Sequence, residues 1–248
     1  ESVLPRGMLR VLLSSPLRFL QTAWLAWLGS AVMLHSPSAD RNKGPLLELF
    51  SQKPPFSNSA ARAKVLEIGS GTGQHVAHFA AAFPHCDFQP TEYGGGSAGP
   101  ESAAHGDELA QTLDSIAAYT AALKNVAKPV VLDCKSAEWP EGAFDAICCC
   151  NVLHISPFEV SLGLIKGAGK HLVPGGHLYI YGPFLVCGEH TAPSNAAFDE
   201  RLRSQNAEWG VRCSDALAAA ALAHGLDLVE RTQMPANNFV LHFRKQTA

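Results

Sequence analysis

The sequence predicts an α/β fold: a doubly wound, mostly parallel, seven-stranded Rossmann-like sheet with helices on both faces. A short apolar run, Lys64–Ile68, is followed by three glycines at alternate positions and then by a helical pattern. Strand-like and helix-like segments alternate from there onward, which is typical of parallel strands joined by crossover helices. The Met234–Pro235 break before the last apolar run favours a closing hairpin, so that the last strand is antiparallel.

The elements follow from apolar runs and from the turn residues between them. Strands are expected where apolar residues form short runs, and helices where they recur at helical spacing before a proline or glycine stop. The expected strands are Lys64–Ile68, Cys86–Thr91, Pro129–Leu132, Asp145–Val152, His177–Tyr181, Leu226–Thr232 and Phe239–Arg244. The expected helices are Gln74–Ala82, Leu113–Val126, Phe158–His171 and Asp215–Gly225. A glycine-rich stretch, Gly94–Gly106, is expected to be a surface loop.

The chain divides into three regions: a leader at 1–38, a helical lead-in with a linker at 39–62, and the main domain at 63–248. The lead-in is expected to hold a polar junction at 39–45 and a short amphipathic helix, Leu46–Phe50. A Pro/Ser linker at 53–60 follows that helix.

The leader is basic and poor in acids. With Met8 as an alternative initiator, it carries Arg10 and Arg18 and no acid before the lead-in, which resembles a mitochondrial or plastid transit peptide. Its apolar run, Phe19–Leu34, is interrupted by polar residues and falls short of the ~20 residues of a membrane span. A signal anchor and an unstructured extension are the alternatives. Without an organelle signal, we expect the protein in the cytoplasm.

Composition excludes some classes of function. The net charge is −3 and 17% of the 248 residues are charged, with no basic patch, so a strong electrostatic grip on nucleic acid is not supported. The seven cysteines show no metal-ligand spacing. Cys148–Cys150 are consecutive in an expected strand, where side chains alternate between faces, so we expect small buried hydrophobes and no metal site. Unpatterned cysteines favour a reducing compartment. The oligomeric state is left open.

The glycine turn after the first strand carries the strongest functional signal. Its pattern is E-x-G-x-G-x-G, beginning at Glu67, whereas the dinucleotide fingerprint is G-x-G-x-x-G. A carboxylate at that place repels a phosphate and suits a cationic ligand, such as the amino group and sulfonium of S-adenosylmethionine. We therefore expect the turn to hold that cofactor through Glu67, Gly69, Ser70, Gly71 and Gly73. A purely structural turn is the alternative.

Acids also end the next two strands. In open parallel sheets, ligands bind beyond the carboxyl ends of the strands. Glu92 ends the second strand, about 20 residues after the glycine turn, where an acid binds ribose hydroxyls. Asp133 ends the third strand, where it or a neighbour would face the adenine. The alternatives are a solvated glutamate at Glu92 and a turn cap at Asp133.

With these residues in place, the chain resembles a class I S-adenosylmethionine-dependent methyltransferase, and within that superfamily the methyltransferase-like protein twenty-six family. The resemblance rests on blocks at 39–43, 66–75, 88–90, 151–157, 181–184, 191–195, 208–212 and 234–238. It implies the class I methyltransferase fold and the cofactor, but no acceptor. Two departures are Thr91-Glu92, where the family has Ser-Asp, and the glycine-rich insertion.

Candidates for chemistry follow the fourth and fifth strands. Methyl transfer needs a positioned nucleophile and sometimes a base. His154, Asn151 and Tyr181 are the expected catalytic residues, and Asn151 is also expected at the cofactor. His154 is expected to titrate near neutral pH and accept a proton; a structural histidine is the alternative. His75 is expected near the methionine end of the cofactor, or else exposed on its helix.

The acceptor pocket is expected to lie beyond these residues, with Ser156, Thr191, Asn195, Trp209 and Asn238 on its walls. The alternatives are a helix cap at Ser156, a buried core side chain at Trp209, and turn asparagines that satisfy backbone groups. No Asn-Pro-Pro-Tyr motif follows the fourth strand, which argues against amino-methylating enzymes of the DNA, glutamine and adenine-N6 types.

The sequence therefore predicts a methyltransferase that uses S-adenosylmethionine and acts on a small-molecule acceptor. Two alternatives remain at this point. One is a non-catalytic module that binds the cofactor and acts through partners. The other, disfavoured by the glycine spacing, is a nicotinamide-dependent oxidoreductase.

Overall fold

A computed structural model describes residues 33–95 and 102–247. Its main sheet has seven strands in the order β3-β2-β1-β4-β5-β10-β9. Neighbours from β3 to β5 pair in parallel, and β10 is antiparallel to both β5 and β9. This confirms the predicted doubly wound sheet with one antiparallel strand. The strands are β1 Ala63–Ile68, β2 Cys86–Glu92, β3 Val130–Val131, β4 Phe144–Cys150, β5 Leu172–Gly182, β9 Leu226–Met234 and β10 Asn238–Lys245.

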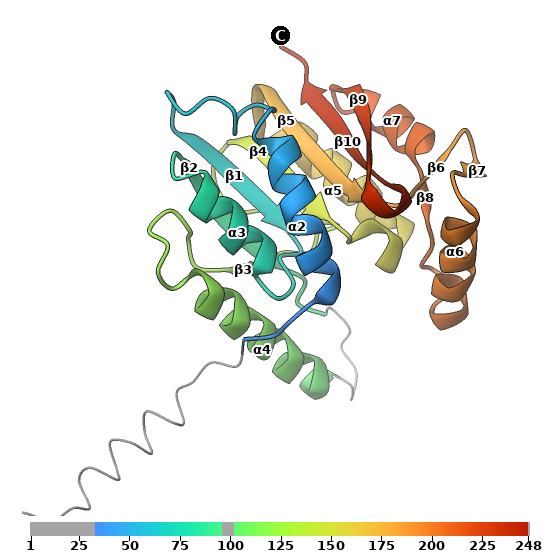
Figure 1. Ribbon diagram of the computed structural model, residues 1–248, viewed down its shortest axis with the longest axis horizontal. Coiled ribbons are helices and arrows are strands. Elements are labelled where there is room, and N and C mark those ends of the chain that lie inside the picture. The colour runs from blue at the N-terminus through green and yellow to red at the C-terminus, as the bar shows by residue number, and fades with distance from the viewer. Residues whose placement is uncertain (1–32, 96–101, 248) are drawn as a thin grey trace, which may run out of the picture.

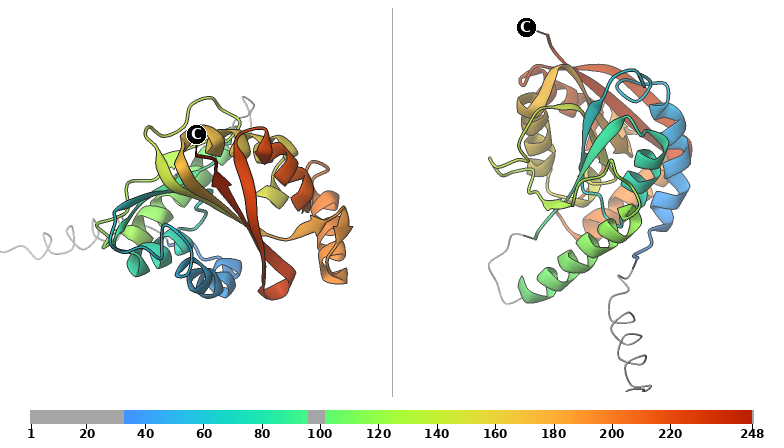
Figure 2. Two further views of the ribbon diagram at one scale, coloured as in Figure 1. Left: turned by 90° about the horizontal axis from the view of Figure 1, so that it is seen from above. Right: turned by 90° about the vertical axis from the view of Figure 1, so that its left-hand side faces the viewer.

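Helices cover both faces of the sheet (Figures 1 and 2). The helices α2 Pro37–Phe50, α3 Gln74–Ala82 and α4 Ser102–Thr120 contribute to one apolar core. The helices α5 Phe158–His171 and α7 Ser214–Leu222 contribute to the other. Alternate residues of β1 divide between the two cores, with Val65 in the first and Leu66 in the second. This period of two is what a strand buried on both faces requires.

The consecutive cysteines follow the same alternation. Cys148 and Cys150 belong to the core under α2 and α3, and Cys149 to the core under α5. All three are buried, as predicted for small hydrophobes, and burial raises the pKa of the Cys148 and Cys149 thiols well above the usual range. The described residues contain no cluster of three metal-ligating side chains. Cys187 is the exposed thiol of the chain.

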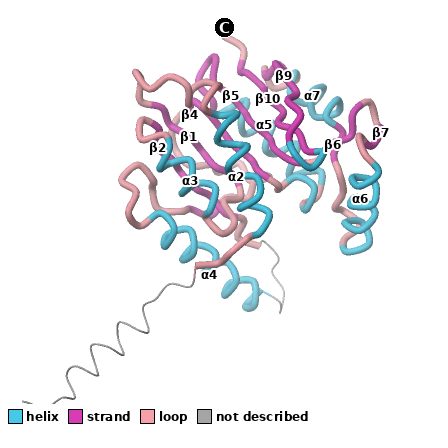
Figure 3. The backbone as a smooth tube through the Cα atoms, viewed as in Figure 1, coloured by secondary structure: helices cyan, strands magenta, loops and turns pink. Residues whose placement is uncertain are grey.

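A second, three-stranded sheet and a further helix were not predicted (Figure 3). The strands β6 Phe184–Val186, β7 Glu189–His190 and β8 Arg212–Cys213 form the small sheet. The helix α6 Pro193–Gln205 begins inside the resemblance block at 191–195, where no helix was expected. Two 3-10 turns, η1 Leu153–Ile155 and η2 Pro235–Asn237, complete the described elements. The strands are too short to show a period, and α6 buries only a narrow stripe, so the usual sequence signal was weak.

The lead-in differs from the expectation, because the polar junction is helical. The helix α2 runs through 39–45 and Pro45 lies inside it. Ser36 caps its N-terminus by accepting a hydrogen bond from the Ala39 amide at 3.4 Å, and Pro37 occupies the first turn, where proline is tolerated. The segment expected as a linker is also packed, since Phe56 is only 3% exposed and stacks on Phe50.

The helix expected at Leu113–Val126 is shifted. It begins at Ser102, inside the stretch expected as a loop, and ends at Thr120. The apolar positions beyond it are used differently, because Val126 bridges Phe88 of β2. Asn125 fixes that turn by donating through Nδ2 to the carbonyls of Ala80, Phe83 and Cys86. Residues 96–101 of the glycine-rich stretch lie outside the described residues, as does most of the expected leader.

Within 33–95 and 102–247, none of the helices combines the length and apolar character that crossing a bilayer requires.

Replacing Phe50 by Ala tests whether α2 belongs to the domain core. Phe50 is 1% exposed and contacts the rings of Phe79 and Tyr179. We expect a loss of about 3–5 kcal/mol in the free energy of unfolding, measured by urea denaturation. Leu222→Ala is the control, because Leu222 is 61% exposed on α7. A loss no larger than that of the control would exclude α2 from the cooperative core.

Candidate active site

A cavity of about 1470 Å³ lies at the carboxyl ends of the parallel strands. It is bordered by the turns after β1, β2, β4 and β5 and by residues of α2, α6 and η2. Its volume exceeds the roughly 300–1,000 Å³ of a pocket for one small ligand, so there is room for two. The predicted site residues on its wall are Gly69, Ser70, Gly71, His75, Glu92, Asp133, Asn151, His154, Ser156, Tyr181, Asn195, Trp209 and Asn238. The structure does not place Glu67, Gly73 or Thr191 there.

The three glycines of the turn do different things. A Cβ on Gly69 would lie 2.6 Å from Cγ2 of Val152, and one on Gly73 would lie 2.7 Å from Cα of Ile116. A Cβ on Gly71 would meet no atom within 4 Å. Close packing therefore accounts for the first and third glycines, whereas the second leaves open space at the cavity. Gly69 and Gly73 therefore fit the alternative of a purely structural turn, whereas Gly71 is the glycine that leaves room for a ligand.

Two buried polar atoms beside this turn have no hydrogen-bond partner among the described residues: Oε2 of Glu67 and Oγ of Ser70. Glu67 is 3% exposed and lies in β1, just before the turn. Burial raises the pKa of the Glu67 carboxyl to about 7. The Ser70 hydroxyl lies near enough to oppose this rise without meeting hydrogen-bond geometry, and the charge of Glu92 adds to it. An unpartnered buried acid is costly, and a cationic ligand would offset that cost.

The acids of the second and third strand ends both reach the cavity. The Glu92 carboxylate accepts hydrogen bonds from the amides of Gly71 at 2.6 Å and Tyr93 at 2.9 Å. Burial raises its pKa, and these two amides oppose the rise. Asp133 accepts a hydrogen bond from the Lys135 amide at 2.9 Å, so its carboxylate also caps a turn.

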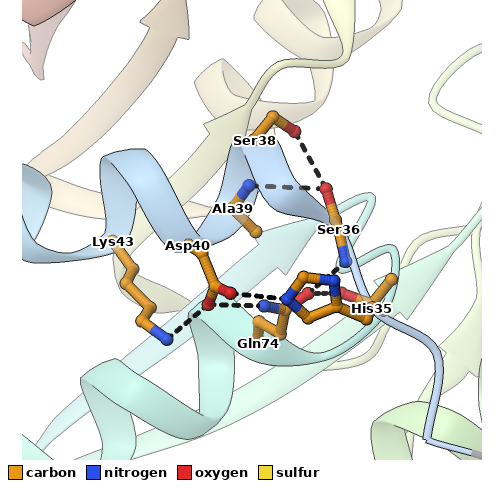
Figure 4. Close-up of polar contacts among 8 residues, drawn as sticks. His35, Ser36, Ser38, Ala39, Asp40, Lys43 and Gln74 are labelled. Atoms are coloured by element: carbon orange, nitrogen blue, oxygen red, sulfur yellow. Dashed lines mark hydrogen bonds and ion pairs between the residues drawn. The ribbon is translucent and has the colours of Figure 1, made fainter.

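The N-terminal part of α2 is fastened to the glycine turn by polar contacts (Figure 4). Oε1 of Gln74 accepts from the Ser36 amide at 2.6 Å and from the Thr72 hydroxyl at 2.8 Å. Nε2 of Gln74 donates to Oδ1 of Asp40 at 2.8 Å, and Lys43 donates to the same oxygen at 2.6 Å. These contacts hold α2 at the edge of the cavity.

His75 is buried beneath α2. It is 8% exposed and its Nε2 lies 2.5 Å from Oδ1 of Asn42, so the expectation of an exposed histidine is wrong. Burial lowers its pKa to about 4. Neither Asn42 nor Gln74 was assigned a role from the sequence. The signal available was their place in two of the blocks that carry the family resemblance.

The candidate catalytic residues meet between β4 and β5. Asn151 follows β4 with φ of 60°, and its amide donates to the Tyr181 carbonyl at 2.9 Å. A Cβ on Gly182 would lie 3.3 Å from Nδ1 of His154, so the imidazole lies against the end of β5. His154 is 8% exposed, and burial with the nearby Arg212 charge lowers its pKa to about 4. The expectation that it titrates near neutral pH is therefore wrong.

Arg212 anchors the turn that carries His154, and sequence reasoning missed it. Its Nε donates to the Leu153 carbonyl at 3.0 Å, and its Nη2 donates to the carbonyls of Ser156 and Glu208. The Gly210 amide donates to the His154 carbonyl at 3.0 Å. A guanidinium suits this role because several donors lie in one plane. The arginine stood in a block of the family resemblance, which was the only sequence signal.

The remaining predicted residues shape the outer wall. The N-cap of α5 is Pro157, and the Ser156 hydroxyl donates to the Leu153 carbonyl at 3.2 Å, so a cap at Ser156 is wrong. Nδ2 of Asn195 donates to Oγ1 of Thr191 at 3.2 Å and to the Asn237 carbonyl at 2.9 Å. Asn238 likewise satisfies backbone carbonyls. Trp209 is half-buried on the wall, not a buried core residue.

The family profile described as protein of unknown function (DUF938) matches residues 33–245. The chain belongs to this family. The match begins just before α2 and ends on β10, so in the DUF938 chain the family region includes the lead-in as well as the sheet.

Solved structures of low sequence identity resemble the DUF938 chain. An O-methyltransferase family protein from Burkholderia thailandensis has a TM-score of 0.64 at 17% identity, over 93% of this chain and 70% of that one. An O-methyltransferase family 2 protein from Planctomyces limnophilus, in complex with apigenin, has 0.63 at 17%, over 92% and 61%. Human N-acetylserotonin methyltransferase, in complex with S-adenosylmethionine, has 0.62 at 14%, over 93% and 56%.

At these identities the likeness shows the fold. The sheet order and the antiparallel β10 are those of the class I methyltransferase fold, as predicted. The DUF938 chain spans between 54% and 70% of the length of the eight solved proteins compared, so most of them carry a large further part.

Replacing Glu67 by Gln tests its buried, unpartnered state through pH. Because its pKa is raised from 4.5 to about 7 in the folded protein, its contribution is fully present below pH 4.5 and is lost as pH rises through 7. The shift corresponds to roughly 3 kcal/mol. Urea titrations at pH 5 and pH 8 should therefore show the variant gaining stability over wild type at the higher pH.

The control is Glu48→Gln, which changes an exposed glutamate of α2. Its stability difference from wild type should be the same at both pH values. A Glu67→Gln difference that also stays constant with pH would mean that the carboxyl keeps an ordinary pKa in the folded protein.

Proposed function

We propose that this protein is an S-adenosylmethionine-dependent methyltransferase acting on a small-molecule acceptor. One observation carries the proposal. A buried acid, Glu67, whose Oε2 makes no hydrogen bond, precedes the open glycine, Gly71, and Gly71 lines a cavity that also holds His154, Asn151 and Tyr181. The acid and the open glycine fit a cationic ligand close to bare backbone, and the three polar residues fit the chemistry of an acceptor.

The residues on the wall offer a partner for each part of the cofactor. Gly71 and Ser70 would contact its methionine part, with Glu67 compensating the positive charge. Glu92 would bind the ribose hydroxyls and Asp133 would face the adenine. His75 and Asn151 would border the methionine end, while Gly69 and Gly73 shape the turn. When bound, the cofactor supplies a methyl group activated by the sulfonium.

The chain's own catalytic contribution is mainly positional. With a pKa of about 4, His154 is neutral at physiological pH and is a hydrogen-bond acceptor for an oxygen or nitrogen nucleophile. Its low pKa makes it a weak base, so orientation of the nucleophile is its larger effect. Asn151 and Tyr181 would hold the acceptor from the neighbouring strand ends. The outer wall, with Trp209 and Asn195, would exclude water from the transfer.

The solved neighbours support a small-molecule acceptor, since they include an O-methyltransferase bound to apigenin and an N-acetylserotonin methyltransferase. Within the superfamily, the blocks named above support membership of the methyltransferase-like protein twenty-six family. The basic leader supports delivery to a mitochondrion or plastid.

Gly71→Asp should abolish cofactor binding in a folded protein. The new side chain would enter the space that the cofactor needs and add a negative charge beside Glu92. The φ of 54° at this position costs aspartate only about 1 kcal/mol, so the fold should persist. Calorimetry with S-adenosylhomocysteine should show at least about a 100-fold loss in affinity, or roughly 2.7 kcal/mol.

The matched control is Gly188→Asp. Gly188 also has a positive φ, of 80°, and a Cβ there would meet no atom within 4 Å, but Gly188 does not line the cavity. It should keep full affinity. Unfolding of Gly71→Asp alone would show that the glycine is structural. Protection of the wild type by NAD and not by S-adenosylmethionine would instead support an oxidoreductase.

His154→Ala should separate catalysis from cofactor binding. We expect cofactor affinity near that of wild type and a fall in turnover of about 10²-fold or more. In the wild type, any loss of rate due to protonation of His154 should occur near pH 4. The measurement is S-adenosylhomocysteine formation with metabolite extract across pH, with His224→Ala, an exposed histidine, as the control.

Equal turnover in the His154 variant would remove this residue from the mechanism. Tight cofactor binding with no turnover in any extract would favour the non-catalytic module.

A further inference from the structure

Charge is distributed unevenly over the cavity. The two carboxylates on its wall, Glu92 and Asp133, lie beyond the ends of β2 and β3 together with Lys135, on the side proposed for the cofactor. The part of the wall built from α2, α6, η2 and the end of β5 contains no carboxylate but has two arginines, Arg41 and Arg201. That part of the wall is therefore positively charged at neutral pH.

Neither arginine has a carboxylate partner within the described part of the chain. Other cations of the same two helices do, since Lys43 pairs with Asp40 at 2.6 Å and Arg203 with Asp199 at 3.1 Å. Asp40 of α2 and Asp199 of α6 are thus paired with cations that do not line the cavity. The lining arginines keep their hydrogen-bond donors free for a ligand.

The Phe198 ring contacts both Arg201 and the candidate catalytic histidine, His154. The Arg201 guanidinium is 5.2 Å from the centre of the Phe198 ring, and that ring meets the His154 imidazole edge-on at 5.4 Å. Arg41 acts at the other candidate, because its charge opposes the rise that burial causes in the pKa of the Tyr181 phenol. Both positive charges therefore lie close to the place where a nucleophile would be held.

We propose that the acceptor is an aromatic or otherwise apolar molecule bearing an anionic group, and that Arg201 binds this group while Arg41 adds positive charge to the same wall. This inference rests on the proposed function. A guanidinium recognises carboxylate or phosphate through paired hydrogen bonds. The neighbouring rings of Phe198 and Trp209 suit the apolar part of such a molecule. Neutral acceptors would leave the arginines without their charged partner.

The test compares matched probes on protein saturated with S-adenosylhomocysteine. Benzoate, phenyl phosphate and the neutral benzamide share a ring of similar size, and ligand-observed NMR titration gives the affinity of each. We expect benzoate or phenyl phosphate to bind at least about tenfold more tightly than benzamide. Phenyl phosphate exceeding benzoate would identify phosphate as the preferred anion, and the reverse order would identify carboxylate.

Two variants assign the preference to a residue. Arg201→Gln should bring the affinity for the anionic probes close to the affinity for benzamide. Arg41→Gln should reduce the preference for the anionic probes by less. Arg62→Gln is the control, because Arg62 pairs with Asp87 on the surface away from the cavity, and it should bind all three probes as wild type does. Saturation with S-adenosylhomocysteine is verified for every variant before the probes are added.

The outcomes separate this proposal from the proposed function. Failure of the wild type to bind S-adenosylhomocysteine would refute the function. Binding of S-adenosylhomocysteine with no detectable anion binding, or with benzamide as tight as benzoate, would overturn the anionic acceptor alone. An anion preference that persists in Arg201→Gln would overturn the role of Arg201.

Discussion

The turn after β1 is held on three sides, and the site depends on that confinement. Gly69 packs against Val152, Gly73 packs against Ile116 of α4, and the Ser70 amide donates to the Thr91 carbonyl at 2.8 Å. Each contact comes from a different part of the chain, so the turn has little freedom to relax. Glu67 is thereby kept buried without a partner, and Gly71 is kept open to the cavity. A site built in this way is formed before its ligand arrives.

The helix α2 extends the same arrangement to the start of the described chain. Its N-terminal contacts go to Gln74 and His75, directly after the glycine turn, and its apolar face goes to Phe79 and Tyr179. One helix therefore joins the core and the edge of the cavity. A change at the cavity edge that moves Gln74 would also alter the contacts of α2, which makes this helix part of the site as well as part of the fold.

Much of the sheet could be predicted because its signals are local. A strand buried on both faces, a glycine turn and a helix at the right spacing are all legible between Lys64 and Ala82. The site could be placed because strand ends meet at one edge of a parallel sheet. What escaped prediction depends on distant partners. Arg212 acts by donating hydrogen bonds to carbonyls more than 50 residues earlier in the sequence. The helix α2 includes a polar stretch whose composition is typical of a junction between elements.

The low pKa of His154 could not be predicted for the same reason. It results from burial against α6 and from the charge of Arg212, and the residues next to His154 in the sequence indicate neither. The separate roles of the three glycines could likewise be assigned only from the structure. One residue separates Gly71 from each of the other two glycines. Yet Gly69 packs against the Val152 side chain, and Gly73 packs against the Ile116 backbone. Spacing alone identifies the turn, whereas the packing shows which of its positions is available to a ligand.

The distribution of thiols has a practical consequence. Six of the seven cysteines are buried or half-buried, while Cys187 is exposed in the turn between β6 and β7, just before α6. Thiolates react and thiols do not, and burial raises the pKa of the Cys86 and Cys134 thiols to about 12. A maleimide dye would accordingly attach most readily at Cys187, next to the helix that carries Arg201. Fluorescence from that dye would report on the side of the cavity lined by α6 without any engineered cysteine.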